Sequence, residues 1–178
     1  MKLEWIPALE RPDLLAPPVE RALRELDGLD GEAKVAEIDP ELADTAAFCE
    51  RYGVALEESA NCVIVAARRG GETRHAAVLV QASTRADVNG AVRRHLGARK
   101  ASFAPREEAV GLTGMEYGGI TPIGLPESWP VLVDEAVAAA PFVVIGSGLR
   151  RSKLALSGAA LARLKAAEVL PVAMPAAS

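Results

Sequence analysis

The chain has 178 residues, of which 50% are hydrophobic and 25% are charged, and its net charge at pH 7 is −4. This balance is typical of one globular domain that can bury a core without disulfides or metal ions. The acidic charge argues against indiscriminate nucleic-acid binding, no apolar run reaches membrane-spanning length, and the N-terminus lacks the apolar core of a signal peptide. With only two cysteines and no disulfide framework, a cytoplasmic protein is expected.

The first third of the chain predicts a proline-rich irregular start, a helix, a strand and a second helix. Val19, Ala22, Leu23 and Leu26 recur at helical spacing before Gly28. Residues 39–41 combine a capping aspartate, a first-turn proline and an acid, which is typical of a helix N-terminus. The predicted elements are an N-terminal extension over 1–32, a strand over 33–38 and a helix from 39 to 52 that ends at Gly53.

The middle of the chain predicts a hairpin followed by two helices. Residues 62–67 and 73–82 are predicted to be strands, and the glycine-containing connection between them is short enough for a hairpin. Thr84, with Asp87 three residues later, predicts the cap of a helix that ends near Leu96. A strand over 98–103 and a helix over 105–112 follow, with Pro105 at the helix start.

The last third predicts three strands, one helix and a loose tail. The strands are expected over 131–134, 142–145 and 153–156, and Ser157 caps a helix over 158–164. Residues 165–178 are rich in alanine and proline and are expected to be loose. Strands that pair locally among helices predict a single α+β domain with a mixed, mostly antiparallel sheet.

A glycine–proline loop over 113–126 is the most informative segment. Gly118 and Gly119 permit backbone angles that side chains forbid, and Pro122 stiffens the chain that follows. Such a loop offers bare backbone N–H groups to a ligand, and the same residues also suit an ordinary surface turn.

The loop and several other segments resemble one known family in its own order. These segments are the loop itself with Gly118-x-x-x-Pro122 and Ile123-Gly124, the strand and acid of 131–135, the strand and glycine-rich turn of 143–151, and the strand and helix of 100–110. Together they resemble the YbaK-like family, which comprises free-standing aminoacyl-tRNA deacylases and the editing insertion of bacterial prolyl-tRNA synthetases. The resemblance covers roughly 48–164.

The resemblance implies a YbaK-like fold, an ester-hydrolase activity and a pocket. It also implies a lysine on the first central strand, where this chain has Asn61, an uncharged amide. Asn61 and Gly119 are therefore the expected catalytic positions, with Gly119 in the loop whose N–H groups would bind an oxyanion. The expected substrate-binding residues are Gly118, Ile120, Thr121, Pro122, Gly124, Asp134, Gly146, Ser147 and Gly148.

Two groups of basic residues could contact RNA phosphates if the fold brings them to one rim. The expected RNA-binding residues are Arg93, Arg94, Lys100, Arg150 and Arg151. Each group also suits an ordinary solvated surface. Asp134 likewise suits a cap of the turn after its strand.

No cofactor and no metal is expected, because the sequence has no P-loop, no nucleophile elbow and no ligand pattern around His75 and His95. Cys62 lies in an apolar strand, which favours a buried, inert thiol.

The resemblance indicates a trans-editing deacylase that hydrolyses a mischarged tRNA carrying a small residue such as Ala, Ser or Cys. Its partners would be the acceptor end of tRNA and an aminoacyl-tRNA synthetase. The alternative is a catalytically silent relative that binds aminoacyl-tRNA, an analogue of it or a partner protein.

Overall fold

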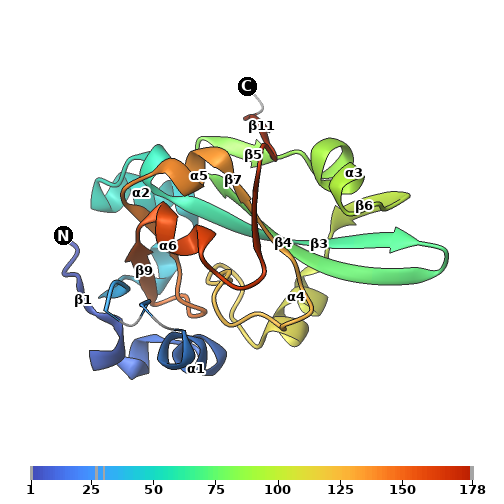
Figure 1. The fold of residues 1–178 in the computed structure, drawn as a ribbon. Coiled ribbons are helices and arrows are strands. Elements are labelled where there is room, and N and C mark those ends of the chain that lie inside the picture. Colours follow the sequence, from blue (N-terminus) through green and yellow to red (C-terminus); the bar gives the residue numbers. More distant parts are fainter. Residues whose placement is uncertain (1, 27, 30, 177–178) are drawn as a thin grey trace.

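The fold, seen in a computed structural model that describes residues 2–26, 28–29 and 31–176, joins two main sheets and six helices (Figure 1). The strands are β1 (Ile6–Pro7), β2 (Lys34–Glu37), β3 (Ala60–Arg69), β4 (Glu72–Gln81), β5 (Thr84–Ala86), β6 (Lys100–Phe103), β7 (Val131–Asp134), β8 (Val143–Gly146), β9 (Ser152–Leu156), β10 (Ala167–Leu170) and β11 (Ala173–Pro175). The helices are α1 (Pro17–Glu25), α2 (Thr45–Tyr52), α3 (Arg93–His95), α4 (Arg106–Thr113), α5 (Glu135–Ala139) and α6 (Gly158–Ala162).

One sheet has the order β1-β2-β9-β8 and is antiparallel throughout. The other has the order β10-β7-β4-β3-β6, in which β7 runs parallel to both β4 and β10. The hairpin of β3 and β4 forms the long axis of this sheet and turns at two glycines with positive φ, Gly70 and Gly71. The predicted hairpin and the predicted α+β fold with a mixed sheet are both confirmed.

The two sheets meet where β3 begins. Ser59 forms a parallel bridge with Val144 of β8, so the first residues of β3 lie beside the antiparallel sheet. Asn61 therefore starts its strand at the junction of the two sheets rather than at a free edge. This junction positions the site described below.

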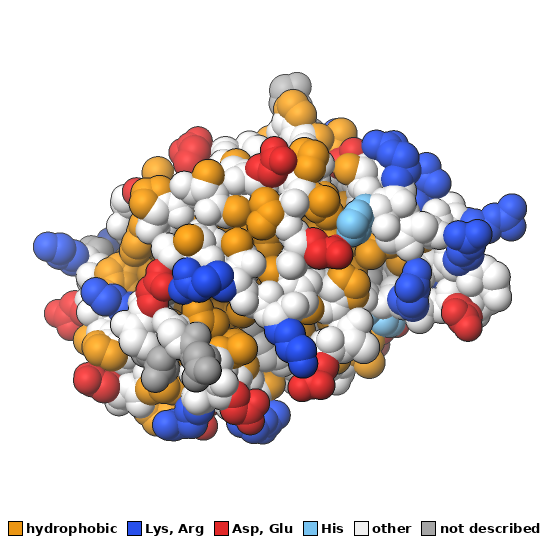
Figure 2. All heavy atoms as spheres, in the orientation of Figure 1, with side chains coloured by type: hydrophobic (Ala, Val, Ile, Leu, Met, Phe, Trp, Pro, Cys, Tyr) orange, Lys and Arg blue, Asp and Glu red, His pale blue; other side chains and the backbone are white. Residues whose placement is uncertain are grey.

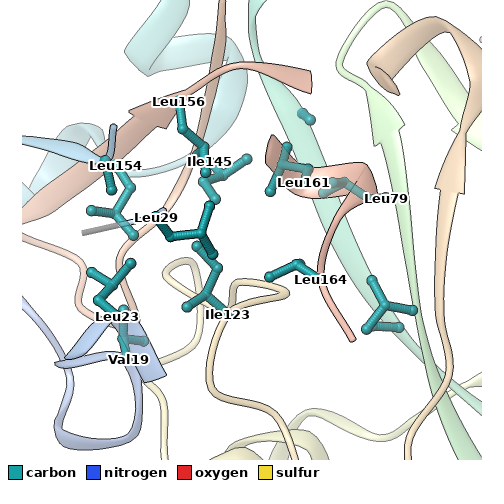
Figure 3. Close-up of a cluster of buried hydrophobic side chains, with 14 of the residues drawn as sticks. Val19, Leu23, Leu29, Leu79, Ile123, Ile145, Leu154, Leu156, Leu161 and Leu164 are labelled. Carbon is teal, nitrogen blue, oxygen red and sulfur yellow. The ribbon is translucent and has the colours of Figure 1, made fainter. Parts of the chain in front are cut away.

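The main hydrophobic core fixes the glycine–proline loop to the sheets. Ile123 of that loop is fully buried and packs with Ile145 and Leu154 of the antiparallel sheet and with Val19 and Leu23 of α1, as Figure 3 shows. Burying a side chain of this size stabilises a fold by about 1.5–3 kcal/mol. Ile123 therefore anchors the loop in the core.

The structure differs from the sequence-based prediction around residue 84. Thr84 lies in β5 and its hydroxyl donates to the Gln81 carbonyl, so it caps no helix. Asp87 is the cap instead, because its carboxylate accepts from the N–H groups of Gly90 and Ala91. A π-helical turn over Val88–Val92 and the short α3 follow.

The C-terminal segment is ordered where a loose tail is predicted. β10 pairs with β7, and β11 pairs with β5. Asp134 fastens the link between them, because its Oδ1 accepts from the N–H groups of Val172 and Ala173 at 3.0 Å. Residues 167–175 thus complete the mixed sheet and hold β5.

Candidate functional site

A cavity of about 470 Å³ opens at the junction of the two sheets. Its walls come from the start of β3, the end of β6, the residues before α2, the glycine–proline loop and the strands β8 and β9. It is lined by Ala43, Asp44, Thr45, Ala60, Asn61, Cys62, Val63, Ile64, Phe103, Ala104, Arg106, Ala109, Tyr117, Gly118, Ile120, Gly146 and Lys153. This volume lies within the usual range for small-molecule sites.

Short contacts that only glycine permits shape the loop wall of the cavity. A Cβ on Gly146 would lie 2.4 Å from the Gly119 carbonyl oxygen, so β8 and the loop touch backbone to backbone. The Gly119 N–H donates to the Glu116 carbonyl at 2.9 Å, and its own carbonyl accepts from the Gly148 N–H at 2.7 Å. Gly119 is therefore used on both sides to fold the loop, and its N–H is not available to a ligand.

Two neighbouring N–H groups remain available. The N–H groups of Gly118 and Ile120 form no hydrogen bond with any described residue, and both residues line the cavity. The loop thus carries bare donors, as the sequence suggests, but at positions 118 and 120 rather than at 119.

Arg150 clamps this loop from the outside. Its guanidinium donates to the carbonyls of Tyr117 at 3.1 Å and Pro40 at 3.0 Å, and it lies 3.8 Å from the Asp44 carboxylate. A Cβ on Gly118 would meet the same guanidinium at 2.4 Å, and Gly118 has φ +87°. Arg150 ties the loop to the segment before α2, which forms the facing wall.

Asn61 lines the cavity and is oriented by one hydrogen bond. The Thr45 hydroxyl donates to Asn61 Oδ1 at 2.5 Å, which leaves the amide nitrogen without a partner among the described residues. An amide nitrogen offers two donors and no charge. Asn61 can therefore hold a ligand oxygen or a water molecule but cannot neutralise an anion.

Lys153 supplies the buried charge of the cavity. Its side chain is only 7% exposed, and its Nζ donates to the Ala43 carbonyl at 3.0 Å and lies 5.2 Å from the centre of the Phe48 ring. Burial lowers the pKa of this lysine to about 8. Sequence analysis groups Lys153 with the surface arginines before it. The signal it misses is strand alternation, which places Lys153 on the same face of β9 as the buried Ala155.

The thiols near the cavity are unsuited to nucleophilic attack. Burial raises the pKa of Cys62 to about 12, and burial also raises the pKa of Cys49. Both thiols stay protonated at neutral pH, and the thiolate is the reactive form.

Aromatic side chains stand at the mouth of the cavity. Phe103 at the end of β6 is 61% exposed, and Tyr117 of the loop is 47% exposed. The Arg106 guanidinium lies over the Tyr117 ring, 4.3 Å from its centre. Exposed rings beside a cavity suit flat ligand groups that stack on them, such as nucleobases.

The other expected substrate-binding residues lie outside the cavity lining. Thr121 is fully buried with an unpaired hydroxyl, and Pro122 and Gly124 line a different hollow beside α1. Ser147 is buried and hydrogen-bonds with Ser152 Oγ, while a Cβ on Gly148 would strike Ala16. Asp134 caps α5 and binds the C-terminal segment. The polar or small character of Ser147, Gly148 and Asp134 thus serves the fold.

The expected RNA-binding residues divide into two sets. Arg150 is half-buried and forms the clamp, whereas Arg151 is exposed and donates to the Asp13 carbonyl. Arg94 and Lys100 of the other set lie at a basic end of the molecule, which also carries four basic residues that were not expected. We define this basic end as the exposed residues Arg68, Arg69, Arg74, Arg94, Arg99 and Lys100. Figure 2 shows Lys and Arg side chains gathered at the end that holds the hairpin tip, α3 and β6. Arg93 is half-buried nearby and bonds the Asn89 carbonyl.

Both histidines have local partners. His75 bonds Glu108 and stacks on Trp129, and His95 bonds Glu168. Among the described residues, no group of three or more His, Cys, Asp or Glu is placed to hold a metal ion. Within the same residues, no helix is long and apolar enough to cross a membrane.

Comparison with known proteins identifies this arrangement. The family model of the aminoacyl-tRNA editing domain matches residues 39–164. A solved structure described as a candidate trans-editing enzyme for prolyl-tRNA synthetase superposes with a TM-score of 0.74 at 23% identity, over 90% of this chain and 99% of the other. The hypothetical protein APE2540 superposes with a TM-score of 0.77 at 24% identity, over 88% and 99%. At these identities the likeness shows the fold. No curated protein gave a significant match.

Proposed function

We propose that this chain, which belongs to the aminoacyl-tRNA editing domain family, is a trans-editing deacylase that hydrolyses the ester of a mischarged tRNA carrying a small amino acid. The main support for this proposal is the cavity at the junction of the two sheets. It brings the expected residues Asn61, Gly118, Ile120 and Gly146 together around one space with free donors in its wall.

The chemistry needs little more than this cavity provides. An aminoacyl ester is activated by the neighbouring ribose hydroxyl, so catalysis requires mainly a positioned water and donors for the oxyanion. The N–H groups of Gly118 and Ile120 are free to act as such donors, and the Asn61 amide is free to hold the water. No acid–base triad is required for this reaction.

The small amino acid follows from the room available. A cavity of about 470 Å³ must take the terminal ribose as well as the aminoacyl group. The lining includes the small apolar residues Ala60, Ala104 and Ala109. Editing sites accept products that fit them, because binding alone distinguishes one methylene by only about 1–3 kcal/mol.

The RNA would approach from the mouth toward the basic end. Phe103 and Tyr117 offer stacking surfaces to the unpaired terminal bases. β6 runs from Lys100 at the basic end to Phe103 at the mouth, so it links the two features directly. We place the phosphates of the acceptor stem along this strand and on the basic end.

A catalytically silent binder is the second candidate function, and Asn61 favours it. The amide on β3 carries no charge, so the strand that would supply a cation by family resemblance supplies none. Such a protein would bind aminoacyl-tRNA or a synthetase without turnover.

A single-turnover deacylation assay separates the two functions. The panel should contain tRNAs charged with Ala, Ser, Cys and larger residues, beginning with the proline tRNA because one structural neighbour is described for prolyl-tRNA synthetase. We expect hydrolysis of esters of small residues above the buffer rate and none of esters of large ones. No hydrolysis of any ester would refute the deacylase, and binding without hydrolysis would leave the silent binder.

The basic end has its own test. Replacing Arg94 and Lys100 together by Glu should weaken tRNA binding, most strongly at low salt, and flatten its salt dependence. The matched control is Lys34→Glu on β2, an exposed lysine outside both the cavity and the basic end. Equal tRNA binding by both proteins would refute this binding surface.

A further inference from the structure

Lys153 is a buried lysine with only two contacts for its ammonium among the described residues, the Ala43 carbonyl and the face of the Phe48 ring. Its ammonium has three donors, and the one acceptor it finds is the Ala43 carbonyl. No carboxylate of a described residue lies within 4.0 Å of its Nζ, whereas five arginine–carboxylate pairs form among the described residues. A buried charge without a counter-ion is unfavourable. A feature that weakens the fold in a cavity points to a ligand.

Strand pairing places Lys153 beside the glycine–proline loop. Lys153 lies directly opposite Gly146 in the β8–β9 pair, and opposite residues share a face of an antiparallel sheet. On that face, the place of a Gly146 Cβ is occupied by the carbonyl oxygens of Gly119 and Ile120. The lysine stem therefore runs beside the loop, and Lys153 lines the same cavity as Asn61.

The surroundings of Lys153 leave the cavity positive. The groups that act on it electrostatically are Cys49 of α2, Arg150 of the turn before β9 and Asp44 before α2. The Asp44 carboxylate lies 3.8 Å from Arg150, so this acid is already shared with a second cation. Arg106 adds a further positive charge to the lining. The site thus suits a ligand with an anionic oxygen.

We propose that Lys153 is the catalytic cation of this site, which reaches from β9 to hold an anionic oxygen of the aminoacyl-tRNA end while β3 contributes only the neutral amide of Asn61. This inference rests on the proposed substrate. An aminoacyl-tRNA presents two such oxygens: a phosphate oxygen near the terminal ribose, and the oxyanion that forms during hydrolysis.

The step is balanced as follows. The water oxygen bonds to the ester carbonyl carbon, and the carbonyl electron pair moves to its oxygen, which becomes the oxyanion. When the double bond re-forms, the bond to the ribose oxygen breaks and one water proton ends on that oxygen. The other is released as the amino-acid carboxylate ionises. Lys153 donates a hydrogen bond throughout and keeps its proton.

The test compares wild type, Lys153→Met and the double variant Asn61→Lys/Lys153→Met in single-turnover deacylation. We expect Lys153→Met to be slower by roughly 10²–10³-fold, the usual effect of losing one oxyanion donor. The double variant should regain a measurable part of the rate, because it returns a positive charge to the cavity from β3. Lys34→Met, an exposed lysine on the neighbouring strand β2, is the control and should match wild type.

Two further readouts exclude a purely structural role. The wild-type rate, corrected for buffer hydrolysis, should fall above about pH 8 as Lys153 loses its proton, whereas the rate of Lys153→Met should not. Affinity for a tRNA with a non-hydrolysable 3′-aminoacyl amide locates the anion. A loss of affinity in Lys153→Met identifies the phosphate, and a loss of rate at saturation alone identifies the oxyanion.

The outcomes also separate this inference from the proposed function. If wild type hydrolyses the ester and Lys153→Met does so equally fast, the deacylase stands and the role of Lys153 is refuted. If wild type is inert, the deacylase is refuted. Binding of the tRNA with the non-hydrolysable 3′-aminoacyl amide then tests the role of Lys153. Equal binding by wild type and Lys153→Met refutes the cation, and weaker binding by Lys153→Met supports it. Lys153→Gln replaces Lys153→Met in each comparison if the methionine variant does not fold.

Discussion

Replacing Lys153 by methionine should make the protein more stable at neutral pH while it removes the proposed activity. Methionine fills a similar volume beside Phe48 and Ala155 and carries no charge. Burial moves the lysine pKa from 10.5 to about 8, which corresponds to a penalty of about 3 kcal/mol for the charged form. Losing the hydrogen bond to the Ala43 carbonyl offsets about 1 kcal/mol of this gain.

The net gain at pH 7 is therefore about 2 kcal/mol, or roughly 5 °C in Tm for a chain of this size. Its pH dependence has a definite sign. The folded-state pKa is the lower one, so between about pH 8 and 10.5 the unfolded chain binds the proton more tightly than the folded chain. The stability of the wild type relative to Lys153→Met should rise through this window, and near pH 10.5 the variant should have lost its advantage.

Urea unfolding at pH 7 and at pH 10.5 measures both effects. Wild type and Lys153→Met share every other titrating group, so their difference isolates the lysine. Lys34→Met replaces an exposed lysine on β2 and so controls for the loss of a positive charge that is not buried. A difference between wild type and Lys153→Met that stays constant across this pH range would show that the lysine is not held in an unfavourable charged state.

Two further predictions concern the walls and the mouth of the cavity. Gly146→Ala should destabilise the fold by about 1–3 kcal/mol, because its Cβ would strike backbone oxygens of the loop that cannot move aside. Gly111→Ala in α4 is the control, because its Cβ meets open space and should raise stability slightly. Urea unfolding of the two variants measures the contrast. Phe103→Ala should weaken binding of a tRNA acceptor-end oligonucleotide by about 1–3 kcal/mol, as expected for one lost stacking contact, and leave the free energy of unfolding nearly unchanged because the ring is exposed; fluorescence anisotropy would detect it, and unchanged affinity would exclude Phe103 from the RNA path.

The parts of the site that local sequence signals describe were predictable. Gly118 has a positive φ, Gly146 stands where two backbones approach closely, and the glycine–proline loop follows a helix closed by Gly114. Asn61 was expected at the start of a central strand and lies there. These features depend on residues that are near one another in the chain.

The parts that depend on distant pairing were not predictable. Lys153 follows two arginines and reads as surface, yet Phe48 of α2 covers the face of its strand that holds Ala155, and α1 with Ile123 of the loop covers the other. Arg150 likewise reads as a phosphate ligand, but its partners are the carbonyls of Tyr117 and Pro40, and the latter is 110 residues away. No local pattern reports which carbonyls will surround a guanidinium.

The strands of the C-terminal segment were not predicted, for a related reason. Residues 167–175 lack strong strand propensity, and their pairing with β7 and β5 is what makes them strands. The propensity of a short alanine-rich segment is weak compared with the ladder it joins. The buried carboxylate of Asp134 further stabilises this pairing, because it accepts hydrogen bonds from the N–H groups of Val172 and Ala173.

The position of β10 also bears on how the chain folds as it is made. Val131, Leu132 and Val133 of β7 are apolar, and without β10 this strand would be the edge of the mixed sheet, paired only with β4; an open edge is a template for association with other chains. Residues 167–170 of β10 cover this edge and follow β7, β8 and β9 in the chain, so β7 stays uncovered until they have been synthesised. Until then the exposed edge of β7 can pair with other chains. A polypeptide truncated before residue 167 would keep this edge exposed and aggregate.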